Sequence, residues 1–389
     1  MKNKKKEGGE ILKIVNKGIK VRIYPNKKQE IQFHKNFGSV RFVYNNILER
    51  LNNLYKKYPG KYRLNLKLIN EFLKQLKQEY PFLKEIESTS LQQSSRDLLK
   101  SYINFFKNPK TNFPKSHTKK NTRLSFRQTV TSNLVQGKYL HLRKYGKIRY
   151  RTSKEYTNLL NSDNIKINNI TIVCDNSKYY AILNIESPVN VWEHTNQAKG
   201  YDLNSNKNSF LVSNTGEKYS FNIDSENQRI KHLNQVLSTK QKGSRSFKRI
   251  QKRLQKVYDK RTNKLNDFIQ KLSTKLVTEC DTIVIENNWN NIKILIGGEQ
   301  NLVFPLMRLK EMLDYKFDWY KSDCTGVVTV DPKWTSKKCH ICGSINTELT
   351  CDDREWFCPV CGNILDRDIN ASINILNRWD NGDCLSTRS

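Results

Sequence analysis

The spacing of hydrophobic and polar residues divides the first half of the chain into strands that flank a helical block. Residues 19–24 alternate apolar and basic side chains, which is typical of a strand with one face in water. From about residue 29 to residue 106 the apolar spacing becomes helical, and strand-like segments follow between residues 123 and 185. This order predicts a β-barrel that is interrupted by a helical insertion.

In the second half, strands and helices alternate after a linker-like segment at residues 188–197. The pattern predicts strands at residues 200–203, 209–213, 282–285 and 327–330, and helices at residues 228–278 (broken at Gly243) and 306–320. Such alternation predicts an α/β sheet with helices on its faces.

The charge of the chain favours a polyanionic partner. Among 389 residues, 69 are Lys or Arg and 37 are Asp or Glu, so the net charge is +32. Residues 331–389 carry seven basic and nine acidic side chains, so the excess lies in the first 330 residues. No apolar run approaches the ~20 residues that span a bilayer, and no apolar signal segment follows the basic start. We therefore expect a cytoplasmic, nucleoid-associated protein that is not secreted and binds nucleic acid rather than a membrane.

The helical region from residue 229 to residue 264 is the most basic part of the chain. It contains thirteen basic residues and one acid, Asp259. Pairing between neighbouring turns cannot neutralise such a run, so contact with phosphates is favoured over a merely solvated helix face. The candidate contacts are Lys248, Arg249, Lys252 and Arg253.

Two Cys-x2-Cys pairs predict a zinc site. Cys339 and Cys342 form the first pair, and after fifteen intervening residues Cys358 and Cys361 form the second. Four thiolates complete the tetrahedral shell of one Zn²⁺ ion, whereas a redox dithiol would need one pair only. Because four protein ligands close the shell, we expect this zinc to be structural.

Three carboxylates are the candidates for chemistry. Asp202 lies in the first strand of the second half, Glu286 ends an apolar strand, and Asp368 opens a helix at residues 371–376. Singly, they could be a turn residue, a surface charge and a helix cap. However, two of the acids lie in otherwise apolar strands of a strongly basic chain. Hydrolysis of a phosphodiester with two Mg²⁺ ions requires such hard oxygen ligands.

With these motifs in place, the chain resembles the TnpB family from about residue 19 to residue 377. TnpB proteins are RNA-guided nucleases of insertion sequences and are related to compact type V CRISPR effectors. The N-terminal part of the resemblance rests on Arg22-Ile-Tyr-Pro-Asn-Lys-Lys-Gln and Arg41-Phe-Val-Tyr-Asn. The C-terminal part rests on Gly200-Tyr-Asp-Leu, Ile283-Val-Ile-Glu, Thr335-Ser-Lys-Lys-Cys-His-Ile-Cys-Gly and Asp366-Arg-Asp-Ile-Asn-Ala.

The resemblance implies a RuvC-type, RNase H-like nuclease whose catalytic, Mg²⁺-binding acids are Asp202, Glu286 and Asp368. Asp368 is preferred to Asp366 because the family's metal ligand stands two residues before an Asn, which is Asn370 here. Asp366 is expected to play a supporting part.

The resemblance also implies the partners, which are a guide RNA and double-stranded target DNA bound by a monomeric protein. Gln92 and Gln93 become candidates for reading a short motif beside the target. Family members often have Gly two residues after the first acid, where this chain has Asn204. Because Asn tolerates left-handed backbone geometry, we expect the turn to be kept.

The implied fold is an α+β multidomain protein, in which a wedge barrel with a helical insertion precedes the RuvC-like α/β domain and its inserted zinc ribbon. Its parts are a flexible leader (1–17), the wedge barrel (18–40 and 108–187) with its helical recognition insertion (41–107), a linker (188–197), the RuvC-like domain (198–337 and 364–379) with the zinc ribbon (338–363), and a flexible tail (380–389).

The main hypothesis is therefore a Mg²⁺-dependent, RNA-guided DNA endonuclease associated with a transposable element. Two alternatives stay open. One is an RNA-guided DNA-binding repressor whose nuclease is silent, and the other is an RNA-independent DNA transposase or recombinase. A zinc-ribbon transcription factor would leave the three acids unexplained.

Overall fold

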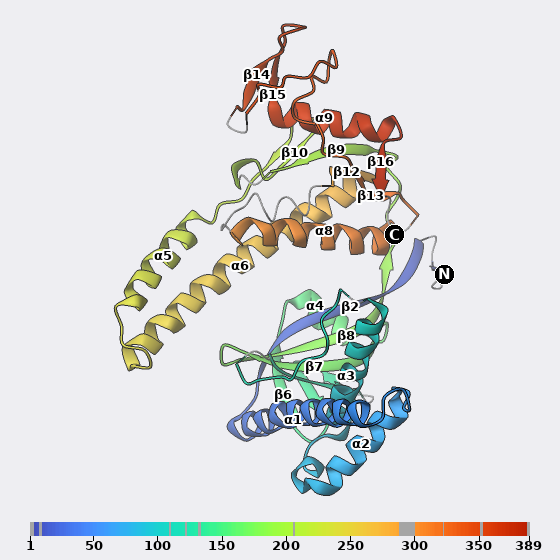
Figure 1. The fold of residues 1–389 in the computed structure, drawn as a ribbon, viewed down its shortest axis with the longest axis vertical. Helices are drawn as coiled ribbons and strands as arrows, with labels where there is room; N and C mark the ends of the chain where they lie inside the picture. The colour runs from blue at the N-terminus through green and yellow to red at the C-terminus, as the bar shows by residue number, and fades with distance from the viewer. Residues whose placement is uncertain are drawn as a thin grey trace. The chain divides into compact units, whose positions relative to one another are not determined.

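The computed structural model of the chain describes residues 4–7, 10–108, 110–120, 123–130, 134–204, 207–287, 300–321, 323–350 and 353–386. They belong to two compact units (Figure 1). The first contains residues 14–188, and the second contains residues 4–13 together with the chain from residue 189 onward. Among the described residues, no helix is both long and apolar enough to cross a membrane.

The first unit is built on a largely antiparallel sheet, and its strand β8 buries every second side chain along its length. In the order β3-β7-β8-β2-β6-β5-β4, the strands are β3 (Leu124–Thr129), β7 (Lys166–Asp175), β8 (Lys178–Asn190), β2 (Glu10–Tyr24), β6 (Gly146–Arg151), β5 (Tyr139–Leu142) and β4 (Val135–Gln136). A further strand, β1 (Lys4–Glu7), pairs with the start of β2, and helix α4 (Lys154–Leu160) follows β6.

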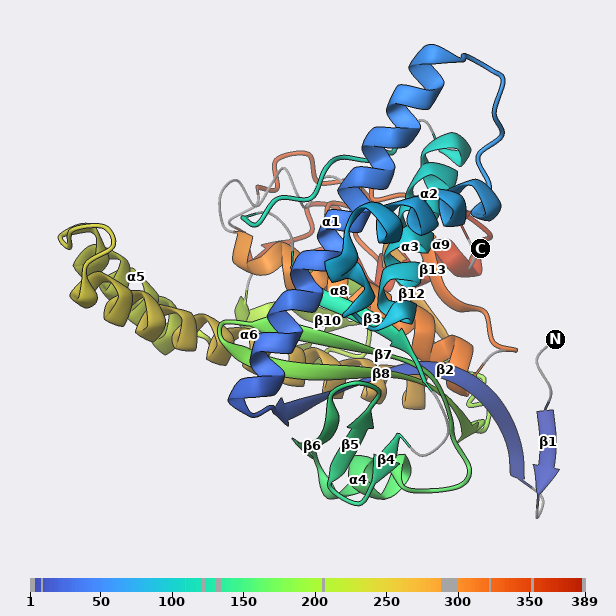
Figure 2. The ribbon, with the colours of Figure 1, turned by 90° about the horizontal axis from the view of Figure 1, so that it is seen from below.

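Three helices separate β2 from β3: α1 (Lys27–Lys57), α2 (Leu66–Glu79) and α3 (Ser88–Lys107), with the short helix η1 (Pro81–Lys84) between the last two. The long helix α1 begins at a capping box formed by Asn26 and Gln29. Its first half sends Phe33 and Phe37 into the core of the sheet, across which it runs (Figure 2). Its second half packs against α2 and α3 in a separate core. The predicted helical block between strands is thus present.

The expected barrel is not closed. The described strands of this sheet end at β3 on one side and β4 on the other, with no pairing between them. Helix α1 covers the sheet with two buried Phe side chains, so the core is filled without closure. The expected flexible leader is also wrong from residue 10 onward, because β2 already begins at Glu10 and Val15 is buried.

The second unit contains a six-stranded mixed sheet. In the order β11-β10-β9-β12-β13-β16, its strands are β11 (Lys218–Tyr219), β10 (Leu211–Ser213), β9 (Ala198–Leu203), β12 (Thr282–Glu286), β13 (Gly326–Val330) and β16 (Cys384–Ser386). The central strand β12 runs parallel to both β9 and β13. The tail was expected to be flexible, but β16 pairs antiparallel with β13.

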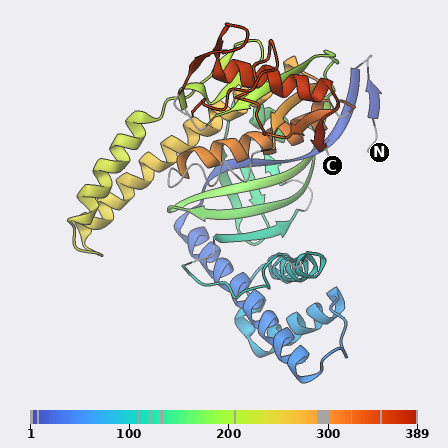
Figure 3. The same ribbon diagram turned by 45° about the horizontal axis from the view of Figure 1, so that its top comes forward.

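Helices cover both faces of this sheet. Helices α6 (Arg245–Glu279) and α8 (Gln300–Tyr320) share one core with Tyr201, Ile283 and Ile285. On the opposite face, α9 (Arg367–Asp380) packs Ile375 against Val284 and Val330, and Figure 3 shows it lying over the strands. The alternation of side chains along β12 explains both packings. The predicted α/β sheet with helices on its faces is confirmed.

Helix α5 (Asp224–Ser238) and the first half of α6 form a hairpin that extends away from this sheet (Figures 1 and 3). The two helices have a small core of their own, formed by Ile230, Leu233, Ile250, Leu254 and Val257. Gly243 turns the chain between them at φ 85°, which confirms the predicted break. The cysteine-bearing segment between β13 and α9 contributes one hairpin, β14 (Glu355–Phe357) and β15 (Ile364–Asp366).

Candidate active site

Two of the three candidate acids lie side by side at the ends of parallel strands. In the pairing of β12 with β9, Ile285 is opposite Tyr201, and Glu286 and Asp202 are the next residues on each strand. Since Tyr201 and Ile285 enter the core beneath α6 and α8, the side chains that follow them turn to the other face. Asp202 and Glu286 therefore share the face that α9 covers.

Gly200 brings the third acid to this face. A Cβ atom at Gly200 would lie 2.3 Å from the carbonyl oxygen of Ser372 and 2.8 Å from the backbone nitrogen of Leu376. Helix α9 thus touches the backbone of β9, an approach that only glycine permits. Asp368 lies one helical turn before Ser372 and is 6 % exposed. The close packing carries its carboxylate to the strand ends.

The other two acids lie close enough to Asp202 to raise its pKa, although the carboxylate oxygens of the three acids do not all lie within 4.8 Å of one another. Burial, and then the charges of Glu286 and Asp368, raise the pKa of Asp202 well above its ordinary value. Neighbouring carboxylates repel one another, and a cation between them would remove that repulsion. Their hard oxygen donors suit divalent ions such as Mg²⁺ or Mn²⁺.

The neighbouring Asp366 has a different task. Its carboxylate caps α9 by accepting hydrogen bonds from the backbone nitrogens of Asp368 and Ile369, both at 3.0 Å. Although partial burial raises its pKa, the hydrogen bond from Lys218 at 2.6 Å leaves that pKa below its ordinary value. Asp366 thus orients the first turn of α9, while Asp368 faces Asp202 and lies 3.6 Å from Arg354.

The expectation for Asn204 needs correction. Its backbone does not have a positive φ, although other described non-glycine residues do. Its side-chain amide instead donates a hydrogen bond to the carboxylate of Asp202 at 3.1 Å, and its backbone nitrogen donates to Phe210 at 3.0 Å. Asn204 therefore supports the first acid directly.

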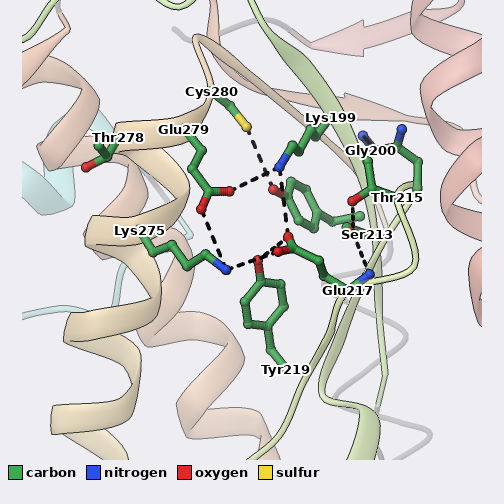
Figure 4. Close-up of polar contacts among 12 residues, drawn as sticks. Lys199, Gly200, Ser213, Thr215, Glu217, Tyr219, Lys275, Thr278, Glu279 and Cys280 are labelled. Carbon is green, nitrogen blue, oxygen red and sulfur yellow. Dashed lines mark hydrogen bonds and ion pairs between the residues drawn. The ribbon is translucent and has the colours of Figure 1, made fainter.

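On the opposite face, a network of charges fixes β9 to α6 (Figure 4). Lys199 lies 3.0 Å from Glu279, and Lys275 lies 3.2 Å from Glu217. The hydroxyl of Tyr219 donates to Glu217 at 2.8 Å. Strand β9 is thus held from both sides, by this network and by α9, which fixes where Asp202 lies.

The four predicted zinc ligands converge. The sulfurs of Cys339, Cys342, Cys358 and Cys361 all lie within 4.8 Å of one another. Two of the separations are 3.7 Å and 3.6 Å, close to the edge of about 3.8 Å that Zn–S bonds of about 2.3 Å give a tetrahedron. A backbone N–H of Cys361 and the hydroxyl of Ser344 lower the pKa of Cys358 to about 6. The cluster fits a zinc site.

The structure divides the basic region of α5 and α6 into two parts. Lys260 and Lys264 both pair with the buried Glu226, at 2.9 Å and 2.8 Å, and so join α6 to the start of α5. These two lysines are therefore structural. The four candidates for phosphate contact, Lys248, Arg249, Lys252 and Arg253, are all exposed on the face of α6 that turns away from its contact with α5.

In the first unit, the two candidate base readers lie in α3 and differ in their surroundings. Gln92 is exposed, whereas Gln93 is half-buried and lines a pocket with Arg41, His117 and Arg127. A pocket with cationic and aromatic side chains suits the edge or face of a base.

A second group of possible metal ligands was not singled out from the sequence. Nδ1 of His194 lies 3.3 Å from Asp281 and 3.1 Å from the sulfur of Cys324. The fully buried Lys321 already pairs with Asp281 at 2.7 Å and, against the effect of burial, helps to hold its pKa well below the ordinary value. This ion pair gives the carboxylate a structural partner, and we assign no metal to the group.

Three sequence families match parts of the chain. The family described as "Helix-turn-helix domain" matches residues 15–60, which fold as β2 and α1. "Probable transposase" matches residues 182–287, which contain Asp202 and Glu286. "Cas12f1-like, TNB domain" matches residues 307–375, which contain Asp368 and the four cysteines.

The mixed α/β fold resembles that of Cas12f1. The Cas12f1 chain in the cryo-EM structure of a Cas12f1–sgRNA–target DNA complex matches with a TM-score of 0.57 and 13 % identity, over 93 % of this chain and 98 % of that chain. Among curated proteins, one of Streptomyces pristinaespiralis named "Putative RNA-guided DNA endonuclease" is 30 % identical over 93 % of this chain and 89 % of its own length. InsQ of Escherichia coli (strain K12), which has the same designation, is 25 % identical over 92 % and 91 %. The chain belongs to the TnpB family.

Proposed function

We propose that this protein is an endonuclease that cleaves DNA at a site chosen by base pairing with a bound guide RNA, next to a short motif that the protein reads. We further propose that its gene is carried by a transposable element. The observation that carries the proposal is that Asp202, Glu286 and Asp368 lie near one another on one face of the sheet. The names of its relatives support the choice of RNA as guide and DNA as target.

The three acids would hold two Mg²⁺ ions, which supply an activated water and stabilise the leaving oxygen of a scissile phosphodiester. Asn204 and Asp366 keep two of the acids in place, the first by a hydrogen bond to Asp202 and the second by capping α9. The four cysteines would hold one structural Zn²⁺ ion. The exposed cations of α6 would bind phosphates, and Gln93 with its pocket would contact the motif beside the target.

The two alternatives explain the structure less well. A nuclease-silent repressor has no need to bring three repelling carboxylates together. A recombinase that works without RNA could use such acids, but it would join DNA ends rather than depend on a guide.

The experiment is a cleavage assay of the protein purified with the RNA transcribed from its genomic neighbourhood. We expect Mg²⁺-dependent cutting of duplex DNA that matches the co-purified RNA, and complete loss of cutting after RNase treatment. Cutting or strand transfer that survives RNase would contradict guidance by RNA. Binding of matched DNA without cutting, in Mg²⁺ and in Mn²⁺, would show a repressor instead.

A further inference from the structure

Helix α9 carries a stripe of polar side chains that holds the backbone of the preceding loop. Asn370, Asn374 and Arg378 follow one another at intervals of four residues, so they lie on one side of the helix. Asn374 donates to the carbonyl oxygen of Thr335 at 2.9 Å, and Arg378 donates to that of Asp331 at 2.6 Å. The helix that bears Asp368 therefore fixes the loop at residues 331–340, which we call the clamp loop.

The clamp loop also reaches the second acid. The hydroxyl of Thr335 donates a hydrogen bond to the carboxylate of Glu286. The carbonyl oxygen of Pro332 lies 3.0 Å from the same hydroxyl, but one proton serves one acceptor at a time and the carboxylate is the stronger acceptor. Thr335 is 2 % exposed, so water competes little for this bond.

The end of the clamp loop is the first cysteine pair. Asn370 and Asn374 both donate to the carbonyl oxygen of Lys338, at 2.8 Å and 2.6 Å, and Cys339 is the next residue. The backbone nitrogen of His340, between the two cysteines, donates to the side-chain oxygen of Asn370 at 3.0 Å. The side-chain amide of Asn370, two residues from Asp368, thus donates to Lys338 and accepts from His340, so it contacts the backbone on both sides of Cys339.

The backbone of the clamp loop has an unfavourable conformation at one residue. Trp334, beside Thr335, has φ 65°, a conformation that bulky residues rarely adopt. Such a conformation persists only where the surroundings over-determine it, and the contacts from α9 supply that restraint.

We infer that the clamp loop positions Glu286 relative to Asp368, with Thr335, Asn370 and Asn374 as positioning residues, and that it couples the cysteine site to the affinity of the acids for divalent ions. The inference rests on the proposed function, because it takes these acids to be the metal ligands. Its physical basis is that a ligand carboxylate keeps its orientation through its own hydrogen-bond partners.

The test is the binding of Mn²⁺ to the full-length protein, freed of nucleic acid and followed by the electron paramagnetic resonance signal of free Mn²⁺. Thr335→Val keeps the shape of the side chain and removes its hydroxyl, so we expect Mn²⁺ affinity to fall about 10- to 100-fold while zinc content stays at that of the parent. Thr335→Ser restores the hydroxyl and should bind Mn²⁺ as the parent does. Asn374→Ala, which frees the loop without touching Glu286, should weaken binding in the same direction.

The variant Glu286→Gln distinguishes the assignment of Glu286 as a metal ligand from the positioning role of the clamp loop. If this variant binds Mn²⁺ as tightly as the parent, the assignment of Glu286 as a ligand fails and the clamp fails with it. If Glu286→Gln weakens binding but Thr335→Val and Asn374→Ala do not, the site stands and the clamp is overturned. A loss in Thr335→Val that Thr335→Ser does not rescue would also overturn it.

Discussion

Gly200 is the residue on which the closeness of α9 and β9 depends. Its missing side chain lets the backbone of the helix contact the backbone of the strand, and this contact places Asp368 at the strand end that bears Asp202. Asn204 and Asp366 then act on the two acids separately, one through a side-chain amide and the other through a helix cap. At this scale the site depends on small polar and glycine residues beside each acid.

We expect Gly200→Ala to disturb both stability and cleavage. The added methyl group would meet backbone atoms at 2.3 Å and 2.8 Å, and such overpacking costs about 1–3 kcal/mol. Thermal unfolding measures the effect on stability, and a cleavage assay measures the effect on activity. We expect the rate of cleavage to fall strongly, because α9 must move away from β9 and takes Asp368 with it. Gly38→Ala is the control, since nothing lies within 4 Å of its added Cβ in helix α1. A Gly200→Ala protein as stable and active as the parent would contradict the packing argument.

At the scale of elements, each face of the sheet in the second unit has its own role. Helices α6 and α8 cover the face that carries the apolar core, and α9 covers the face that carries the acids. The hairpin of α5 and α6 adds an exposed basic surface to a helix whose other half belongs to the core. Because Glu226 already engages Lys260 and Lys264, the cations left for a polyanion lie nearer the tip of the hairpin.

We expect neutralisation of this surface to weaken RNA binding in a salt-dependent way. Each alanine at Lys248, Arg249, Lys252 or Arg253 that removes a phosphate contact should reduce the slope of log affinity against log salt by roughly 0.7–0.9. Filter binding of the co-purified RNA over a range of salt concentrations gives that slope. Lys271→Ala is the matched control on the same helix, because Lys271 already pairs with Asp267 at 2.7 Å. Equal slopes for all variants would exclude this surface as the interface.

The elements show which parts of the fold are visible in a sequence. Long helices and buried strands were predicted because their apolar residues repeat over many positions, as in α6 and β12. Helix α4 was missed because its seven residues bury Leu160 alone and leave no period. Strand β16 was missed because three residues next to the C-terminus have no pattern before they pair with β13.

The candidate site was predictable to a similar degree. The cysteine pairs were predicted from their spacing alone. The three acids were predicted from their places at the ends of strands and at the start of a helix in a basic chain, and the resemblance to the TnpB family then supported that choice. The clamp loop was not predictable, because its contacts are made to backbone carbonyls that every sequence contains. Its one visible signal was the spacing of Asn370, Asn374 and Arg378 at intervals of four residues.

At the scale of the whole molecule, positive charge is distributed unevenly along the chain. The whole excess of positive charge lies in the first 330 residues, which also contain Asp202 and Glu286, whereas the remaining residues supply the cysteine site and the last acid. The three acids come from segments far apart in the sequence, and two parallel strands and one helix bring them together. The candidate site therefore depends on the packing of β9, β12 and α9.

The most direct measurement of the central claim is the rate of guided DNA cleavage by single variants of the acids. Asp202→Ala, Glu286→Ala and Asp368→Ala should each lower the rate by about 10³-fold or more, because each would remove a proposed metal ligand. Asp366→Asn is the matched control, since an asparagine can still cap α9, and it should keep most of the rate. If any one of the three alanine variants cuts as fast as the parent protein, the three acids are not the active site.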